Sequence, residues 1–198
     1  MKMTKKNNTG FIETPIKEQL IYSGRIFDLR KDEIETEEGL KATREYVKHN
    51  GGVCILAVNK EGKIAIINQY RYPVKAECLE LPAGKLEKDE DPMEGALREL
   101  EEEIGFRAKK IEDYGVTYPC VGYSSEVIHL YVATELVETH TNFDEDERIK
   151  CKWFTVQEIR DMLETNIVFK DSKTIVLLYK YLHCLDKQAI VAKDTNLN

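Results

Sequence analysis

The chain has 198 residues, of which 42% are hydrophobic and 33% are charged, a composition typical of a single globular domain. Its longest uninterrupted apolar run, residues 53–58, is too short to cross a bilayer, so the sequence predicts no membrane partner. The formal net charge of −7 and the lack of a basic run exclude a nucleic-acid binder that relies on phosphate contacts.

The start of the chain and its cysteines indicate the cellular compartment in which the protein works. The first ten residues, MKMTKKNNTG, are basic and polar with no apolar stretch behind them, so we expect no secretory signal. The five cysteines lie far apart without a CxxC pair, which disfavours a zinc site and a disulfide framework. Buried free thiols suit a reducing compartment, and we expect a cytoplasmic protein.

The N-terminal part of the chain, residues 1–48, is predicted to form an antiparallel sheet. Strands are expected over residues 18–22, 25–35 and 42–48, with a turn at Glu38-Gly39. These strands are charged, alternating and poor in core residues, so the sheet has difficulty burying itself alone. We therefore expect it to pack on the rest of the chain or on a second subunit.

The remaining sequence predicts an α+β fold with a mixed sheet between helices, because strands and helices alternate without βαβ regularity. A hairpin is expected from the two apolar runs that flank a turn at residues 59–62. The predicted strands are 53–58, 64–70, a strand over 79–86 that ends in a Pro-Ala-Gly bend, 127–133 and 149–154. The predicted helices are 92–104, a helix from residue 155, and 172–184.

The helix predicted over residues 92–104 carries an unusual charge. Residues 87–103 hold nine acidic and two basic residues, so this segment alone accounts for the net charge of the chain. Asp91 is expected as the N-cap, Glu94 as its capping-box partner and Gly105 as the stop signal. The stripe that is predicted to face the core consists of Met93, Leu97, Leu100 and Ile104.

Three carboxylates flank that stripe. Glu99, Glu102 and Glu103 share an arc of about 100° on the helix, and such clustered hard oxygens suit Mg²⁺ or Mn²⁺. The alternative interpretation is a solvated acidic face, which is common in Glu-rich helices and to which we assign Glu94 and Glu101.

The spacing around this helix matches a known pattern. From Gly84 the chain reads five residues, Glu90, seven residues, and then RELEEEIGF over residues 98–106. This resembles the Nudix box of the Nudix hydrolase superfamily, with every constrained position filled. The resemblance implies a Nudix-type α/β/α sandwich whose strand–loop–helix motif binds a divalent metal and hydrolyses a nucleoside diphosphate linked to another group.

The resemblance also implies roles for individual residues. Glu99 and Glu103 are expected as direct metal ligands, and Glu102 joins or supports them. The implied metal is Mg²⁺, with Mn²⁺ as a substitute. The Ala83 carbonyl is a further expected ligand, Arg98 is expected to orient the glutamates, and Glu90 is expected to brace the loop. Glu102 and Arg98 therefore count among the predicted catalytic residues.

Three further segments, residues 44–49, 68–71 and 79–87, resemble the ADP-ribose pyrophosphatases of this superfamily. By that resemblance Arg44 and Arg71 contact phosphates or ribose, and their planar guanidinium groups suit that task. Arg25 and Phe27 stand where the family places residues near the adenine. The alternatives are surface ion pairs for the arginines and core packing for Phe27.

Two loops complete the comparison. The loop over residues 118–126 keeps the proline, glycine, aromatic residue and glutamate of the family's substrate marker, but Ser125 replaces the usual Asp. Residues 144–147 form a run of four acids, for which a solvated loop is the alternative. By resemblance this acidic loop closes over the substrate, with Glu145 as the general base and Glu147 as a second contact.

The resemblance to this family implies a homodimer whose subunits exchange their N-terminal segments. Residues 1–48 are then the dimer-forming β segment, and residues 49–198 are the Nudix catalytic domain. The leading prediction is Mg²⁺-dependent hydrolysis of ADP-ribose to AMP and ribose 5-phosphate. The alternatives are the same reaction on another nucleoside diphosphate sugar such as GDP-mannose, a non-catalytic nucleotide-sensing domain, and an acidic cation buffer.

Overall fold

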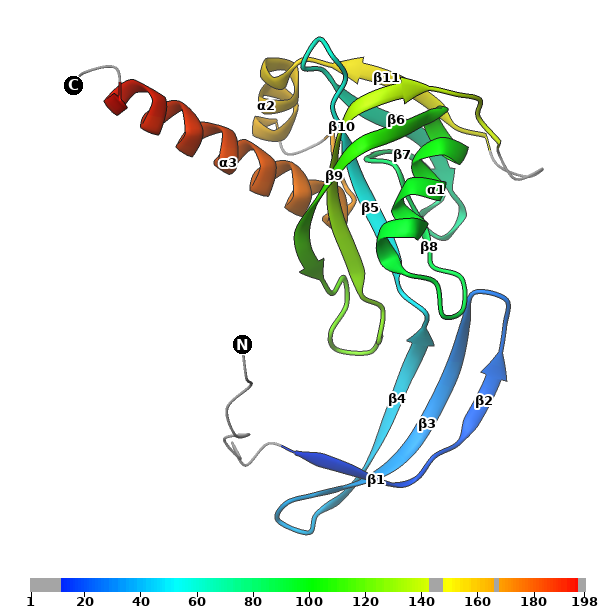
Figure 1. Ribbon diagram of the computed structural model, residues 1–198. Coiled ribbons are helices and arrows are strands. Elements are labelled where there is room, and N and C mark those ends of the chain that lie inside the picture. The colour runs from blue at the N-terminus through cyan, green and yellow to red at the C-terminus, as the bar shows by residue number, and fades with distance from the viewer. Residues whose placement is uncertain (1–11, 143–147, 166–167, 196–198) are drawn as a thin grey trace. The chain divides into compact units, whose positions relative to one another are not determined.

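The computed structural model describes residues 12–142, 148–165 and 168–195, and its elements are drawn in Figure 1. The chain divides into two compact units. The first covers the described residues up to His49 together with Cys120–Glu126, and the second covers Asn50–Pro119 and the described residues from Val127 onward. The predicted division of function between residues 1–48 and 49–198 stays a prediction.

The first unit is an antiparallel sheet built around one long strand, β3 (Phe27–Thr36). Strand β4 (Lys41–His49) pairs along its length, while β1 (Glu13–Lys17) and β2 (Leu20–Ser23) pair with different parts of it. The predicted antiparallel sheet is therefore present. Ile34 is buried, but several other large apolar side chains of this sheet remain exposed, among them Leu20, Ile21, Tyr22, Phe27 and Leu29.

The second unit holds two sheets, one mixed and one antiparallel. The mixed sheet has the order β8 (Ala83–Lys85), β5 (Gly52–Ala57), β10 (Ile128–Glu138) and β9 (Phe106–Thr117), with β5 and β10 parallel. The antiparallel sheet has the order β11 (Lys150–Phe154), β6 (Ile64–Arg71) and β7 (Ala76–Glu80). A short 3-10 turn, η1 (Tyr72–Val74), links β6 to β7.

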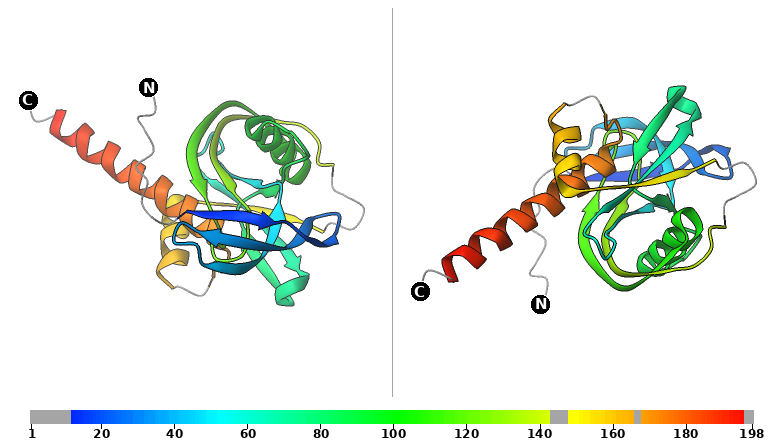
Figure 2. Two further views of the ribbon diagram at one scale, coloured as in Figure 1. Left: turned by 90° about the horizontal axis from the view of Figure 1, so that it is seen from below. Right: turned by 90° about the horizontal axis from the view of Figure 1, so that it is seen from above.

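Helices cover both faces of these strands, and alternation along each strand divides the core in two. On β5 and β10, Cys54, Leu56 and Leu130 face one cluster, while Ile55 and Tyr131 face the other. Helices α2 (Val156–Glu164) and α3 (Ser172–Thr195) close the first cluster, and α1 (Pro92–Ile104) closes the second. Figure 2 shows α1 on the opposite side of the strands from α2 and α3. The predicted α/β/α arrangement is confirmed.

The predicted hairpin over residues 53–70 is wrong as a paired ladder. Strands β5 and β6 meet at a bridge between Val58 and Ile64 and then enter different sheets. Strand β5 and the first four residues of β6 are continuous apolar runs, because these residues are buried on both faces. Burial on two faces therefore produced the apolar pattern that suggested a hairpin.

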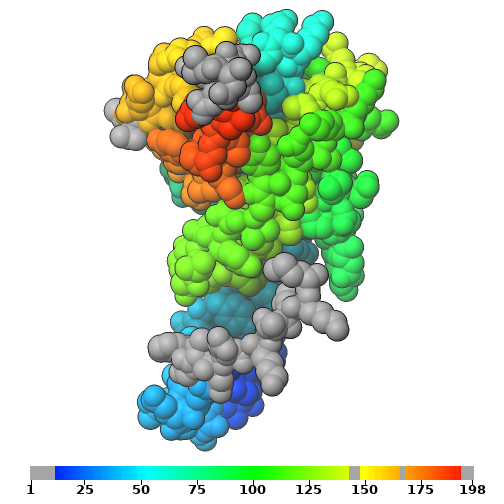
Figure 3. Space-filling view, turned by 60° about the vertical axis from the view of Figure 1, so that its left-hand side comes forward, coloured from blue at the N-terminus to red at the C-terminus, as the bar shows by residue number. Residues whose placement is uncertain are grey.

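Other elements also differ from the expectation. The strand predicted over residues 79–86 is wrong as one strand, because β7 ends at Glu80 in the antiparallel sheet and β8 begins at Ala83 in the mixed sheet. Strand β9 was not predicted, since its sequence is rich in charges, and it pairs with β10 along an edge of the mixed sheet. Helix α3 continues to Thr195, past the predicted end at residue 184. Figure 3 shows the end of α3, coloured red, at the surface of the second unit. The side chains of Tyr179, Ile190 and Val191 on this helix are exposed. No helix in the described part of the chain combines the length and apolar character needed to span a bilayer.

Helix α1 begins and ends where the sequence predicts. The Asp91 carboxylate accepts hydrogen bonds from the N–H groups of Met93 and Glu94, at 2.9 and 3.2 Å. Gly105 ends the helix in the left-handed conformation (φ 72°). The predicted core stripe is partly wrong, because Met93 is exposed and Ala96 is buried in its place. The small Ala96 side chain lets the helix approach the sheet, so the buried face is rotated relative to the expectation.

Replacing Asp91 with alanine is expected to destabilise the fold by about 1 kcal/mol, because two N–H groups of the first turn lose their acceptor. Urea unfolding monitored by circular dichroism measures this difference. Asp91→Asn keeps an acceptor oxygen and is expected to retain most of the stability. Equal unfolding free energies for Asp91→Ala and the wild type would contradict the capping role.

Candidate active site

The most densely charged part of the second unit is the junction of β8, the following loop and α1. Here the Ala83 N–H donates a 2.8 Å hydrogen bond to the Glu103 carboxylate. Glu103 is 4% exposed, so this bond is buried and ties the last turn of α1 to the start of β8. The Ala83 backbone and the Glu103 carboxylate therefore lie side by side, although 20 positions separate the two residues in the sequence.

The glycine next to Ala83 makes room for a second carboxylate. A Cβ atom built on Gly84 would lie 1.9 Å from the Glu99 Cδ atom and 2.0 Å from its Oε1 atom. Any side chain at this position would occupy the space that the Glu99 carboxylate now fills. Gly84 is therefore required for the observed place of Glu99, directly over the backbone of β8.

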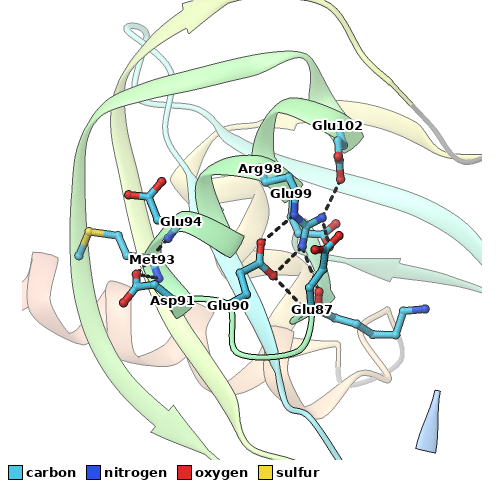
Figure 4. A network of polar contacts seen from close by, with 9 residues as sticks. Glu87, Glu90, Asp91, Met93, Glu94, Arg98, Glu99 and Glu102 are labelled. Carbon is cyan, nitrogen blue, oxygen red and sulfur yellow. Dashed lines mark hydrogen bonds and ion pairs between the residues drawn. The ribbon is translucent and has the colours of Figure 1, made fainter. Parts of the chain in front are cut away.

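Arg98 organises the remaining carboxylates (Figure 4). Its Nη1 donates to Glu99 at 2.9 Å and to Glu102 at 2.8 Å, and its Nη2 donates to the Lys85 carbonyl at 3.1 Å. Its Nε and Nη2 hold both oxygens of Glu90, at 2.9 and 3.0 Å. One guanidinium thus fixes two glutamates of α1 against the loop that leads into the helix.

Glu90 binds the backbone of this loop. Besides binding Arg98, its Oε2 accepts the Glu87 N–H at 2.8 Å. The hydrogen bonds from Arg98 are the main cause that lowers the pKa of Glu90, and the same bonds raise the pKa of Arg98. Both groups are therefore charged at neutral pH, and the loop is held by a charge-assisted pair. Glu90 and Arg98 thus bind each other and the loop, and their bracing and orienting roles stay predictions.

The three glutamates are not spread over a solvated face. The side chains of Glu99 and Glu102 are 13% and 34% exposed, and Glu103 is buried. By contrast, Glu94 is exposed and Glu101 pairs with Arg107 at 2.7 Å. The Glu101 side chain is 27% exposed, less than that of Glu102, so its predicted place on a solvated face is wrong. The acids of α1 differ by partner instead: Arg98 binds Glu99 and Glu102, the Ala83 N–H binds Glu103, and Arg107 binds Glu101.

The carboxylates near Arg98 suit a divalent cation in their chemistry. The guanidinium of Arg98 binds three carboxylates, those of Glu90, Glu99 and Glu102, and Glu103 binds the Ala83 N–H nearby, so these four carboxylates outnumber the one guanidinium. Their oxygens and the Ala83 backbone are the hard donors that Mg²⁺ and Mn²⁺ prefer. Within residues 12–142, 148–165 and 168–195, however, no three His, Cys, Asp or Glu side chains are already gathered as a metal-binding group.

A pocket of about 330 Å³ adjoins Arg98 and Glu102. Its other lining residues, Glu101, Arg107, His140 and Asn142, carry no motif that sequence reasoning could find. Asn142 joins the pocket because its N–H donates to the Glu102 carbonyl at 3.0 Å. The pocket shows that one side of the carboxylate cluster is accessible.

Arg71, the second predicted phosphate contact, lies at the end of β6 in the same unit. Its Nε and Nη2 donate to the two oxygens of Glu80, each at 2.7 Å, and Lys173 binds the same carboxylate. Glu80 and Lys173 were not predicted as site residues. Their positions in the sequence, on a buried strand and at the start of a helix, carry no pattern that pairs them.

Arg25, Phe27 and Arg44 belong to the first unit, and all three are exposed. Arg44 forms an ion pair with Glu13, which matches the alternative interpretation of this arginine. Phe27 is 40% exposed and packs against Tyr22 at 6.3 Å between ring centroids, so it is not a core residue. Their roles in substrate binding stay predictions.

The two predicted loop contributions have different outcomes. In the loop that resembles the substrate marker, the Ser125 Oγ accepts the His49 N–H at 3.0 Å, so this serine fixes the end of β4. Glu145 and Glu147, the predicted general base and second contact, lie outside the described residues.

Comparisons with known proteins agree with this geometry. The NUDIX domain family model matches residues 48–178. The chain is 39% identical over 183 residues to the ADP-ribose pyrophosphatase of Bacillus subtilis (strain 168), covering 91% of this chain and 97% of that protein. It is 40% identical over 168 residues to the methanol dehydrogenase activator of Bacillus methanolicus, covering 84% and 90%. A solved structure described as an ADP compounds hydrolase shares the fold, with a TM-score of 0.78 at 22% identity over 89% of this chain and 95% of that one.

Proposed function

The chain belongs to the NUDIX domain family of hydrolases, and on that premise we propose that it hydrolyses the pyrophosphate bond of ADP-ribose to AMP and ribose 5-phosphate. The observation that carries the proposal is the cluster in which Arg98 holds Glu99 and Glu102 beside the backbone that Glu103 binds. The choice of ADP-ribose is supported by the similarity to the Bacillus subtilis enzyme, which extends over nearly the full length of both chains.

Nudix hydrolases generally need a divalent metal, and we propose Mg²⁺, with Mn²⁺ as a substitute. Glu99, Glu102, Glu103 and the Ala83 carbonyl would hold it. When bound there, a dication would supply neutralisation of the diphosphate charge and a lowered pKa of a bound water. The rigid backbone at β8 and the capped helix α1 keep the carboxylates in place, and Arg98 limits their mutual repulsion.

The other residues are proposed to bind substrate. Arg71 contacts the phosphates, and its fixed guanidinium geometry supports this role. Arg44 is proposed as a second phosphate or ribose contact, and Arg25 and Phe27 are proposed to lie near the adenine. Glu145 is proposed as the general base, with Glu147 as a second contact, because a water that attacks phosphorus must lose a proton.

We propose a homodimer that exchanges the N-terminal segment. The proposal is supported by the sheet of the first unit, whose exposed side chains include Ile16, Leu20, Ile21 and Leu29 at 36–51% exposure. A soluble monomer seldom leaves so many large apolar side chains uncovered on one small sheet. Sedimentation equilibrium is expected to give twice the chain mass of 22.9 kDa, and a monomer mass would refute the proposal.

We also propose that the protein works in the cytoplasm. All five cysteines are free thiols in the structure. Free thiols persist in a reducing compartment, and this supports the proposal.

Turnover of a substrate panel with Mg²⁺ tests the proposed function. ADP-ribose is expected to give the highest kcat/KM, and EDTA is expected to abolish turnover. A preference for GDP-mannose would favour the alternative nucleoside diphosphate sugar. Nucleotide binding without turnover of any substrate would favour a sensing domain, and metal binding without nucleotide binding would favour a cation buffer.

A further inference from the structure

A buried ionic network lies at the start of helix α3. Lys173 Nζ lies 2.7 Å from Glu80 Oε2 and 2.9 Å from Asp171 Oδ1. Glu80 is 2% exposed, and it also accepts the two hydrogen bonds from Arg71. Its carboxylate therefore binds two cations that come from different elements, one from β6 and one from α3.

The backbone around this network is also fixed. Thr174 is fully buried, and its Oγ1 accepts the Leu81 N–H at 2.9 Å. The Thr174 N–H in turn donates to Asp171 Oδ2 at 2.9 Å. The first turn of α3 is thus bound to the chain between Glu80 and Ala83. The hydrogen bond from Leu81 to Thr174 therefore links the turn that carries Lys173 to the backbone that is proposed to bind the metal.

Glu80 holds the Arg71 side chain in place, but that side chain is still partly exposed to solvent. The Arg71 side chain is 39% exposed, and none of the hydrogen bonds among the described residues uses its Nη1. The hydrogen bond to Glu80 raises the pKa of Arg71, so the guanidinium stays charged. Burial alone would raise the pKa of Glu80, but Arg71 and Lys173 lower it, so the carboxylate stays charged.

The charge balance explains why two cations are needed. Arg71 and Lys173 together match Glu80 and Asp171, so the network is neutral as a whole. Without Lys173, Arg71 would be the only cation that the described residues bring to this network, against the two carboxylates of Glu80 and Asp171, and the net negative charge would repel a diphosphate. Removing one partner of a buried ion pair destabilises a fold, so a role of Lys173 in the site must be tested by a measurement that a purely structural role would not change.

We propose that Lys173 is a positioning residue that acts through Glu80 to hold the Arg71 guanidinium for the substrate diphosphate. This inference rests on the proposed function, because it needs a substrate whose phosphates Arg71 binds. Lys173 itself need not touch the substrate, so its effect must pass through Arg71.

Lys173→Met is expected to raise KM for ADP-ribose about tenfold while kcat changes less than about twofold. Lys173→Arg keeps the charge and is expected to restore most of the affinity. Lys170→Met is the matched control, because Lys170 is exposed three residues earlier in the chain, and its KM is expected to equal that of the wild type. Lys173→Gln replaces Lys173→Met if the latter does not fold, with the same expected rise in KM.

A double-mutant cycle with Arg71→Ala separates positioning from a structural effect. In the Arg71→Ala background, Lys173→Met is expected to cause no further rise in KM. An unchanged KM for Lys173→Met, or an equal rise in both backgrounds, would overturn the inference and leave the proposed function intact. If the wild type does not hydrolyse ADP-ribose, the proposed function fails. Calorimetric titration of ADP-ribose in EDTA then decides the inference alone: a Kd raised about tenfold by Lys173→Met supports it, and an unchanged Kd or no binding overturns it.

Discussion

Glu103→Gln is expected to lower kcat for ADP-ribose about 1,000-fold while the protein stays folded. Glutamine keeps an acceptor oxygen for the Ala83 N–H, so the bond that ties α1 to β8 survives. It removes the negative charge of the most deeply buried carboxylate in the cluster, and with it one proposed ligand of the dication. The loss should therefore appear in the chemical step and not in the stability.

Steady-state kinetics over a range of Mg²⁺ concentrations measures this effect, and thermal unfolding confirms that the variant is folded. Glu94→Gln is the matched control, since Glu94 lies on the same helix but is exposed and faces no member of the cluster. Its kcat is expected to stay within about twofold of the wild type. Equal turnover by Glu103→Gln and the wild type would favour the nucleotide-sensing alternative.

Gly84→Ala is expected to lower kcat about 100-fold with little loss of stability. The added methyl group would overlap the Glu99 carboxylate, so that carboxylate must leave its place over β8. Because the displaced atoms are the end of a flexible side chain, the move costs the fold little. It nevertheless removes a proposed metal ligand, and activity falls while the unfolding temperature changes by only a few degrees.

Glu99→Gln provides the control for this prediction. If Gly84→Ala acts by displacing Glu99, it is expected to lower kcat by no more than about twofold in a Glu99→Gln background. An additive loss would show that the methyl group acts through the backbone instead. Wild-type kcat in Gly84→Ala would show that the position of Glu99 over Gly84 is not needed for turnover.

Local patterns in the sequence were sufficient for the elements that surround the carboxylate cluster. Asp91 and Gly105 mark the ends of α1 because capping depends on residues within one turn of the helix. Alternation along 128–132 places Ile128, Leu130 and Val132 together in the core cluster that α2 and α3 close, because successive side chains of a strand point to opposite faces. The spacing from Gly84 to Glu103 likewise contains the acids that the structure gathers.

Tertiary structure decided the strand pairing and the helix packing, which local sequence patterns do not contain. The strands of the expected hairpin separate after Val58 because each pairs with partners from distant parts of the chain. Met93 and Ala96 exchange places at the edge of the core, since a helix settles by close packing and not by hydrophobicity alone.

The partners of Arg71 illustrate the same limit. Lys173 meets Glu80 across 93 positions in the sequence, and no periodicity relates a residue on β7 to one at the start of α3. The sequence by itself determined the helix that carries the glutamates, its caps and the residue types of the cluster. Only the folded chain decided which backbone each carboxylate touches and which cation holds it, because those contacts depend on strand register and on the docking of α3.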